Sequence, residues 1–155
     1  MLDRFYLKSP AFEDHGMIPE RYTCEGSDLN PELHIHNTPE EAKSLALIMD
    51  DPDAPTGVFT HWLIWNISPE VTTIKVGEVP EGARQGITSF HKVGYGGPCP
   101  PTGKSHRYYF RLFALDRVID LPESAHREDL ERLIQAHVIG RTELLGTYKR
   151  ESVLY

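Results

Sequence analysis

The sequence predicts an all-β domain with one helix near its C-terminal end. Short runs of β-branched, aromatic and other apolar residues are bounded by turn residues, which is typical of strands. Twelve glycines and twelve prolines interrupt the 155 residues too often for long helices, and only one segment has a helical apolar period. A chain of this length fits a single domain, so we expect one domain over residues 1–155.

Strands are predicted where such runs end at turn residues. In chain order they are 4–8, 33–36, 44–49, 60–67, 106–115 and 147–154, of which 44–49, 60–67 and 106–115 are the strongest. Residues 124–138 are predicted to form the helix, with Ser124 as N-cap, because apolar residues recur there at spacings of three and four. A second helical turn is expected around 142–145.

Charge and composition exclude several classes of protein. Sixteen Lys and Arg against 23 Asp and Glu give a net charge of −7, and no basic run could follow a phosphate backbone, so we expect no nucleic-acid partner. The longest apolar runs, 45–49 and 63–67, are far shorter than the roughly 20 residues of a membrane span. The first residues do not resemble a signal peptide, and we therefore expect a cytoplasmic protein.

Two pairs of residues leave alternatives open. Cys24 and Cys99 lie 75 positions apart, which does not say whether they meet; we expect buried thiols, because disulfides are rare in the cytoplasm. His34 and His36 share one face of a predicted strand and could bind a metal. Few carboxylates accompany them, so a surface edge strand is the simpler interpretation.

Two strand junctions combine polar and aromatic residues. In MDDPDAPTGVFTHWLIWN, three aspartates leave one strand and His61 opens the next. In GYGGPCPPTGKSHRYYF, a loop with seven Gly or Pro among residues 94–103 leads to His106. Strict alternation places His61 on the face of Leu63, Trp65 and Ile67, and His106 on the face of Tyr108, Phe110 and Leu112.

We interpret the two junctions as parts of a pocket at the rim of a sheet. Two imidazoles beside a Gly/Pro loop with accessible backbone N–H groups would suit a small anion. Each feature taken alone has a structural explanation, since Asp forms turns, a strand-edge His is commonly structural and a Gly/Pro stretch is commonly a loop.

Four stretches together resemble the bacterial and archaeal branch of the phosphatidylethanolamine-binding protein family, also called Raf kinase inhibitor proteins. They are SPAFEDHGMIPERYTCEG, AKSLALIMDDPDAPTGVFTHWLIWN, GYGGPCPPTGKSHRYYFRLFALD and AHVIGRTELLGTYKR. The resemblance implies a β-sandwich-like fold of two antiparallel sheets with a C-terminal helix, and one small cavity for phosphate-like anions. Matched by position, the lining residues would be Asp51, Asp53, Pro55, His61, Gly97, Pro100, Pro101, His106 and Tyr108.

The resemblance also implies a function in binding. The ligand would be a phosphate-containing small molecule or a phospholipid head group, the protein partner a protein kinase or a serine protease, and the assembly a homodimer. His61 and His106 would donate hydrogen bonds to a phosphoryl oxygen, Tyr108 would add a hydroxyl, and Asp51 would orient an imidazole. An inhibitor of proteases would present a rigid exposed loop, for which 76–89 and 94–103 are candidates.

The sequence contains no evident activated nucleophile. A G-x-S-x-G motif is absent, and Cys99 lies between two prolines with no helix N-terminus to lower its pKa. We therefore expect no catalytic residue, metal ion or cofactor. The alternative is a metal-dependent enzyme with His61, His106 and Asp51 as a two-His, one-carboxylate site.

Overall fold

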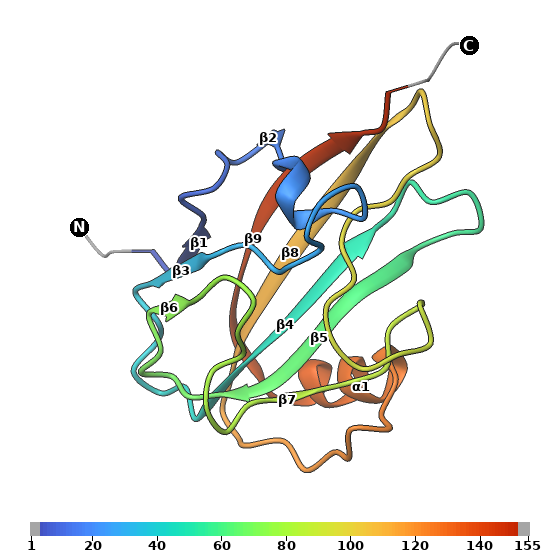
Figure 1. Ribbon diagram of the computed structural model, residues 1–155. Coiled ribbons are helices and arrows are strands. Elements are labelled where there is room, and N and C mark those ends of the chain that lie inside the picture. Colours follow the sequence, from blue (N-terminus) through green and yellow to red (C-terminus); the bar gives the residue numbers. More distant parts are fainter. Residues whose placement is uncertain (1–3, 152–155) are drawn as a thin grey trace.

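The computed structural model describes residues 4–151, which form two sheets and one α-helix (Figure 1). The strands are β1 (Tyr6–Lys8), β2 (Gly16–Met17), β3 (Leu33–His36), β4 (Ser44–Asp51), β5 (Phe59–Ile67), β6 (Thr73–Ile74), β7 (Arg84–Gln85), β8 (Ser105–Leu115) and β9 (Val138–Lys149). A 3-10 turn covers Glu20–Tyr22, and α1 covers Arg127–His137. The predicted class, strands with a single C-terminal helix, is confirmed.

The sheets differ in size. The small sheet has the order β1-β3-β6 and the large sheet the order β2-β9-β8-β4-β5-β7. Neighbouring strands are antiparallel except β2 and β9, which run parallel with Gly16 opposite Gly146. The expectation of two antiparallel sheets therefore holds for every named pair of strands but this one.

The large sheet is covered on both faces. One face packs against the small sheet through residues such as Trp62, Phe110 and Leu33, and the other packs against α1 through Leu63, Trp65 and Leu130. All eight residues of β4 are buried as a result. This two-sided burial explains why β4 and β5 appear in the sequence as continuous apolar runs.

The helix begins two residues later than the sequence predicts. Ala125 is buried and its carbonyl accepts a hydrogen bond from the Ile87 N–H at 2.9 Å, so this residue contacts another segment instead of entering the helix. His126 takes the N-cap position in place of Ser124, and the Asp129 carboxylate accepts a hydrogen bond from its backbone N–H at 2.9 Å.

The second helical turn expected around 142–145 is wrong. β9 begins directly after α1 and runs through these residues, with Glu143 opposite Arg111 and Leu144 opposite Phe110. The ladder with β8 continues to Lys149, and this long pairing outweighs the local helical preference. The weak strand signal at 147–154 is thus the end of β9, and residues 152–155 lie outside the described residues.

The edge-strand interpretation of His34 and His36 is also wrong. β3 is the middle strand of the small sheet, and both of its histidine side chains contact neighbouring residues. His34 Nε2 lies 2.6 Å from a carboxylate oxygen of Glu32, and the His36 ring stacks on Tyr6 with centroids 4.3 Å apart. We find no arrangement of three or more metal-ligating side chains in residues 4–151.

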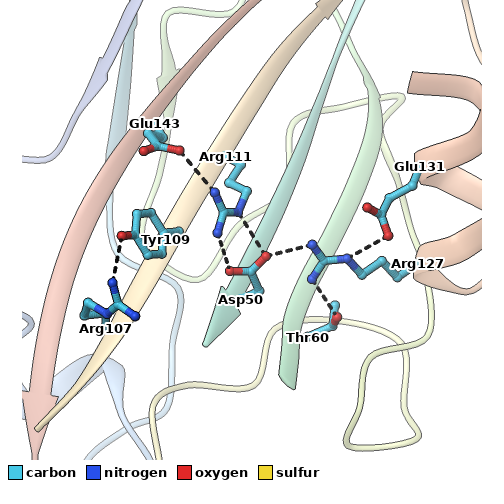
Figure 2. Close-up of polar contacts among 8 residues, drawn as sticks. All are labelled: Asp50, Thr60, Arg107, Tyr109, Arg111, Arg127, Glu131 and Glu143. Atoms are coloured by element: carbon cyan, nitrogen blue, oxygen red, sulfur yellow. Dashed lines mark hydrogen bonds and ion pairs between the residues drawn. The ribbon is translucent and has the colours of Figure 1, made fainter. Parts of the chain in front are cut away.

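A charge cluster joins the large sheet to α1 (Figure 2). Its centre is the fully buried carboxylate of Asp50, which accepts hydrogen bonds from Arg111 Nε at 3.0 Å and Nη2 at 3.1 Å, and which pairs with Arg127 Nη2 at 2.8 Å. Arg127 also donates to Thr60 at 3.2 Å and to Glu131 at 3.0 Å. The cluster thereby ties the helix to β4, β5 and β8. It lies on one face of the large sheet, and Asp51, the residue after Asp50, lies on the other.

Candidate functional site

A cavity of about 270 Å³ opens at the end of the large sheet where β4 ends and β5 and β8 begin. It brings together two imidazoles, a carboxylate and a phenol from segments far apart in the sequence. The lining residues are Asp51, Ala54, Pro55, Thr56, Phe59, His61, Phe90, Cys99, Pro100, Pro101, His106 and Tyr108.

Most residues that the sequence singled out line this cavity. They are Asp51, Pro55, His61, Pro100, Pro101, His106 and Tyr108. Asp53 and Gly97 are not among the lining residues and instead hold the surrounding loops. Sequence reasoning missed Phe59 and Phe90. Phe59 lies two positions before His61, so strand alternation could have indicated it, whereas no local signal indicated Phe90.

The carboxylate of Asp51 contacts the ring of His106. His106 Nδ1 lies 2.7 Å from Asp51 Oδ2, and both side chains are 4% exposed. The other carboxylate oxygen of Asp51 accepts a hydrogen bond from the Asp53 N–H at 2.7 Å. Both oxygens of Asp51 therefore have a partner within the protein, and one of them holds the His106 ring.

His61 reaches the cavity through an irregularity of the sheet. The pairing of β4 with β5 shifts between Met49 and Asp50, so that Trp62 lies opposite Met49 while Thr60 lies opposite Asp50. This bulge breaks the expected alternation: Leu63 and Trp65 pack on the α1 side, whereas His61 lines the cavity beside Tyr108, with ring centroids 5.3 Å apart. The predicted shared face is wrong.

The His61 ring is held by the Gly/Pro loop. Its Nδ1 donates a hydrogen bond to the Gly96 carbonyl at 2.7 Å. Burial lowers the pKa of His61 below its usual range, and the Gly96 carbonyl and the Asp51 charge oppose this shift only in part. We therefore assign His61 as a neutral imidazole near pH 7, with the hydrogen on Nδ1.

The Tyr108 hydroxyl is a buried polar group with no hydrogen-bond partner among the described residues. Burial, and next the negative charge of Asp51, raise the pKa of Tyr108 well above its ordinary value, so the hydroxyl keeps its proton. A buried hydroxyl without a partner is costly, and this one lines the cavity.

Phenylalanines form an apolar wall beside the imidazoles. Phe59 and Phe90 meet edge to face at 4.8 Å, and the Phe90 ring lies 5.2 Å from the His61 ring. Gly96 permits this packing, because a Cβ there would lie 2.3 Å from the Phe90 ring. The side chains that line the cavity are mainly apolar, with few convergent polar groups, as is common in ligand sites.

Two glycine amides of the Gly/Pro loop already have acceptors within the protein. The Gly96 N–H donates to the His61 carbonyl at 3.0 Å, and the Gly97 N–H donates to Asp28 at 2.8 Å. A Cβ on Gly97 would lie 2.2 Å from the Tyr22 carbonyl oxygen, so the loop needs glycine to approach this segment. The amides of Gly96 and Gly97 are therefore not available to a ligand.

Cys24 and Cys99 form a disulfide, so the expectation of two buried thiols is wrong. Both residues are exposed, and Cys99 lines the cavity. The bridge fixes the Gly/Pro loop to the segment after the 3-10 turn, where the Cys24 N–H also donates to the Pro98 carbonyl at 3.1 Å.

Asp53 clamps the loop after β4 to β8. Its carboxylate accepts hydrogen bonds from Arg107 Nε at 2.9 Å, from Nη2 at 2.8 Å and from the backbone N–H at 2.9 Å. These bonds to Arg107 lower the pKa of Asp53 to about 2. Asp53 therefore supports the cavity from outside.

A larger depression of about 590 Å³ lies beside the N-terminal end of α1. Its histidines, His91 and His126, are exposed, and its arginine, Arg127, is already paired with Asp50 and Glu131. Only the smaller cavity contains a buried polar side chain that lacks a partner in the described part of the chain.

The arrangement does not support the metal-site alternative. A two-His, one-carboxylate site would need Asp51 and both imidazoles directed at one point. Asp51 instead bonds His106 Nδ1 with one oxygen and a backbone amide with the other. Asp51 and His106 form a hydrogen-bonded pair, while His61 Nδ1 bonds the Gly96 carbonyl, so the three side chains are not a set of convergent ligands.

The fold and site define a β-sandwich-like protein with one small, mainly apolar cavity at the end of its large sheet. A family model described as phosphatidylethanolamine-binding protein matches residues 8–149. The chain belongs to this family, as the sequence resemblance predicted.

Relatives and solved structures agree with this assignment. A UPF0098 protein of Methanothermobacter thermautotrophicus is 50% identical over 149 residues, which cover 93% of this chain and 98% of the relative. The crystal structure of a phosphatidylethanolamine-binding protein homologue from Chlamydia trachomatis is 38% identical, with a TM-score of 0.92 and coverage of 97% of this chain and 100% of that one. YbcL of Escherichia coli, a member of the mammalian PEBP family, is 29% identical, with a TM-score of 0.90 and coverage of 96% and 100%.

Proposed function

We propose that the cavity binds the phosphate group of a small molecule or of a phospholipid head group, and that the protein acts by binding and not by catalysis. The observation that supports this best is the Tyr108 hydroxyl, buried without a partner in residues 4–151 and lining the cavity between two oriented imidazoles. A bound oxyanion would give this hydroxyl an acceptor.

Charge and size agree with such a ligand. A positive charge on His106 would lie next to the Asp51 carboxylate and so would be balanced within the protein, while its Nε2 could donate to an anion. The volume of about 270 Å³ lies below the roughly 300–1,000 Å³ of drug-sized pockets, and so suits a head group better than a whole lipid.

Partners and location belong to the same proposal. The family supports a regulatory or inhibitor-like module directed at a protein kinase or a serine protease, and the test is whether micromolar protein slows chymotrypsin-like enzymes. Light scattering tests the homodimer.

In residues 4–151 no helix is long and apolar enough to span a membrane. A cytoplasmic location remains our prediction, although the disulfide is a bond that reducing compartments seldom preserve.

An NMR amide titration with O-phosphorylethanolamine tests the binding function. We expect saturable shifts at residues 51–61 and 94–108, and their loss in His106→Ala. His34→Ala is the matched control, because His34 lies on the small sheet and pairs with Glu32. Absence of saturable shifts in the unsubstituted protein would contradict the proposal.

A further inference from the structure

The two imidazoles of the cavity differ in the partner of Nδ1. His106 Nδ1 faces a carboxylate oxygen of Asp51 at 2.7 Å, and His61 Nδ1 faces the Gly96 carbonyl at 2.7 Å. A carbonyl or carboxylate oxygen can only accept, so Nδ1 has the hydrogen in both rings. A neutral ring at either position then offers Nε2 as a hydrogen-bond acceptor, and a charged ring offers it as a donor.

The two rings differ in the charge that surrounds them. His106 has the Asp51 carboxylate to balance a positive charge, whereas His61 has a carbonyl and the rings of Phe59, Phe90 and Tyr108 around it. The charged or titratable groups that act on His61 or share its cavity are Asp50 and Asp51 of β4 and His106 and Tyr108 of β8. Burial outweighs the attraction of the two carboxylates and lowers the pKa of His61. His61 is therefore the acceptor of the pair.

We infer that His61 Nε2 accepts a hydrogen bond from the P–OH of a singly protonated phosphomonoester, while His106 and Tyr108 donate to its other oxygens, so that the cavity selects monoesters over diesters. This inference rests on the proposed function. It assigns His61 the role of a specificity-determining residue.

The chemistry of the two ligand classes explains the selection. A phosphomonoester has a second pKa of about 6, and below that pH it has one P–OH and one negative charge. A phosphodiester also has one negative charge but no P–OH. In the complex with a diester, the lone pair of His61 Nε2 would face an oxygen lone pair, and a buried acceptor would be left without a partner.

An ammonium group could also donate to His61 Nε2, so the decisive probes contain no amine. We would measure dissociation constants of methyl phosphate and dimethyl phosphate by NMR titration between pH 5 and 8. Below pH 6 we expect methyl phosphate to bind at least about tenfold more tightly, which is roughly the effect of one missing hydrogen bond at a buried acceptor. Glycerophosphoethanolamine is the third probe, because it adds an ammonium to a diester.

The ratio of the two affinities is the sharpest readout. Protein groups that titrate and change the affinity for both esters equally have no effect on this ratio. The ratio therefore depends on whether the monoester is protonated. We expect the preference for methyl phosphate to decrease as the pH rises through about 6, because the P–OH is lost. A site that acts by positive charge alone would show the opposite trend, because the dianion would bind more tightly than the monoanion.

Each other outcome is distinct. A ratio that stays flat or rises with pH, or imidazolium nitrogen shifts of His61 in the complex, would overturn the inference and leave the phosphate site in place. If glycerophosphoethanolamine binds as tightly as methyl phosphate and dimethyl phosphate binds more weakly, the donor to His61 is the ammonium. This result would also overturn the inference. No saturable shifts with any probe would overturn the proposed function itself. His34→Ala should reproduce the ratios of the unsubstituted protein at every pH.

Discussion

The Tyr108 hydroxyl is buried and has no hydrogen-bond partner within residues 4–151. In Tyr108→Phe we expect the free energy of unfolding to stay the same or to rise by about 1 kcal/mol, because removal of a buried unpaired hydroxyl removes its desolvation cost. Affinity for methyl phosphate should fall about fivefold to tenfold, which corresponds to one hydrogen bond. Chemical denaturation and NMR titration measure the two effects.

Tyr109→Phe is the matched control. Tyr109 follows in the chain but lies on the other face of β8, where its hydroxyl accepts from Arg107 at 3.5 Å. This variant should leave affinity unchanged. Equal affinity of Tyr108→Phe and the unsubstituted protein would show that the Tyr108 hydroxyl does not contact the ligand.

The Asp53–Arg107 pair predicts a difference in acid stability. The pKa of Asp53 is lowered from 3.8 to about 2 by its hydrogen bonds to Arg107, so folding favours the charged carboxylate. The stabilisation is therefore fully present above about pH 4 and is lost as the pH falls towards 2. In acid denaturation, the stability difference between the unsubstituted protein and Asp53→Asn should be constant above pH 4 and shrink below it. A difference that persists unchanged to pH 2 would be inconsistent with the charged pair.

At the scale of elements, the Gly/Pro loop is shaped by contacts to a segment about 70 residues away. Gly97 donates to Asp28, the Tyr95 hydroxyl donates to the Tyr22 carbonyl at 2.7 Å, and Cys99 is bonded to Cys24. Since Pro100 and Pro101 of this loop line the cavity, the conformation of the loop determines the shape of the site.

Reduction of the disulfide should therefore affect both stability and binding. For Cys24→Ser combined with Cys99→Ser we expect a loss of about 2–4 kcal/mol, because the bridge restricts the unfolded chain. Methyl phosphate should bind more weakly, because the loop is less constrained. Thermal unfolding and titration with and without dithiothreitol measure these effects, and the double variant should not respond to the reductant. Identical melting temperatures of the oxidised and reduced protein would contradict the prediction.

At the scale of the whole molecule, the Asp50 cluster joins the two-layered sandwich to its helix. Asp50→Asn would leave Arg111 and Arg127 without the buried carboxylate that balances them, so we expect a loss of about 3–5 kcal/mol in the free energy of unfolding. Glu143 pairs with Arg111 at 3.2 Å but is 53% exposed, and Glu143→Gln should cost about 1 kcal/mol or less. Urea denaturation of both variants checks the prediction; a similar small loss in each would show that burial adds nothing to the cluster.

Much of the fold could be predicted from local sequence. Strands that are buried on both faces appear as continuous apolar runs, and buried and more exposed residues alternate along β8. Both patterns can be recognised from neighbouring residues in the sequence. The two junctions also contained most of the residues that line the cavity, because side chains at the ends of neighbouring strands meet at one rim.

Other features depended on how distant segments pair. A register shift opposite Met49 and Asp50 turned His61 to the cavity face, and the ladder with β8 made 142–145 a strand. The sequence by itself determined most of the residues that border the cavity and the order of the main strands, since those signals are local. Only the tertiary structure decided the face of His61, the partner of Cys99 and the bonding of the loop amides, because each depends on contacts between residues that are not neighbours in the chain.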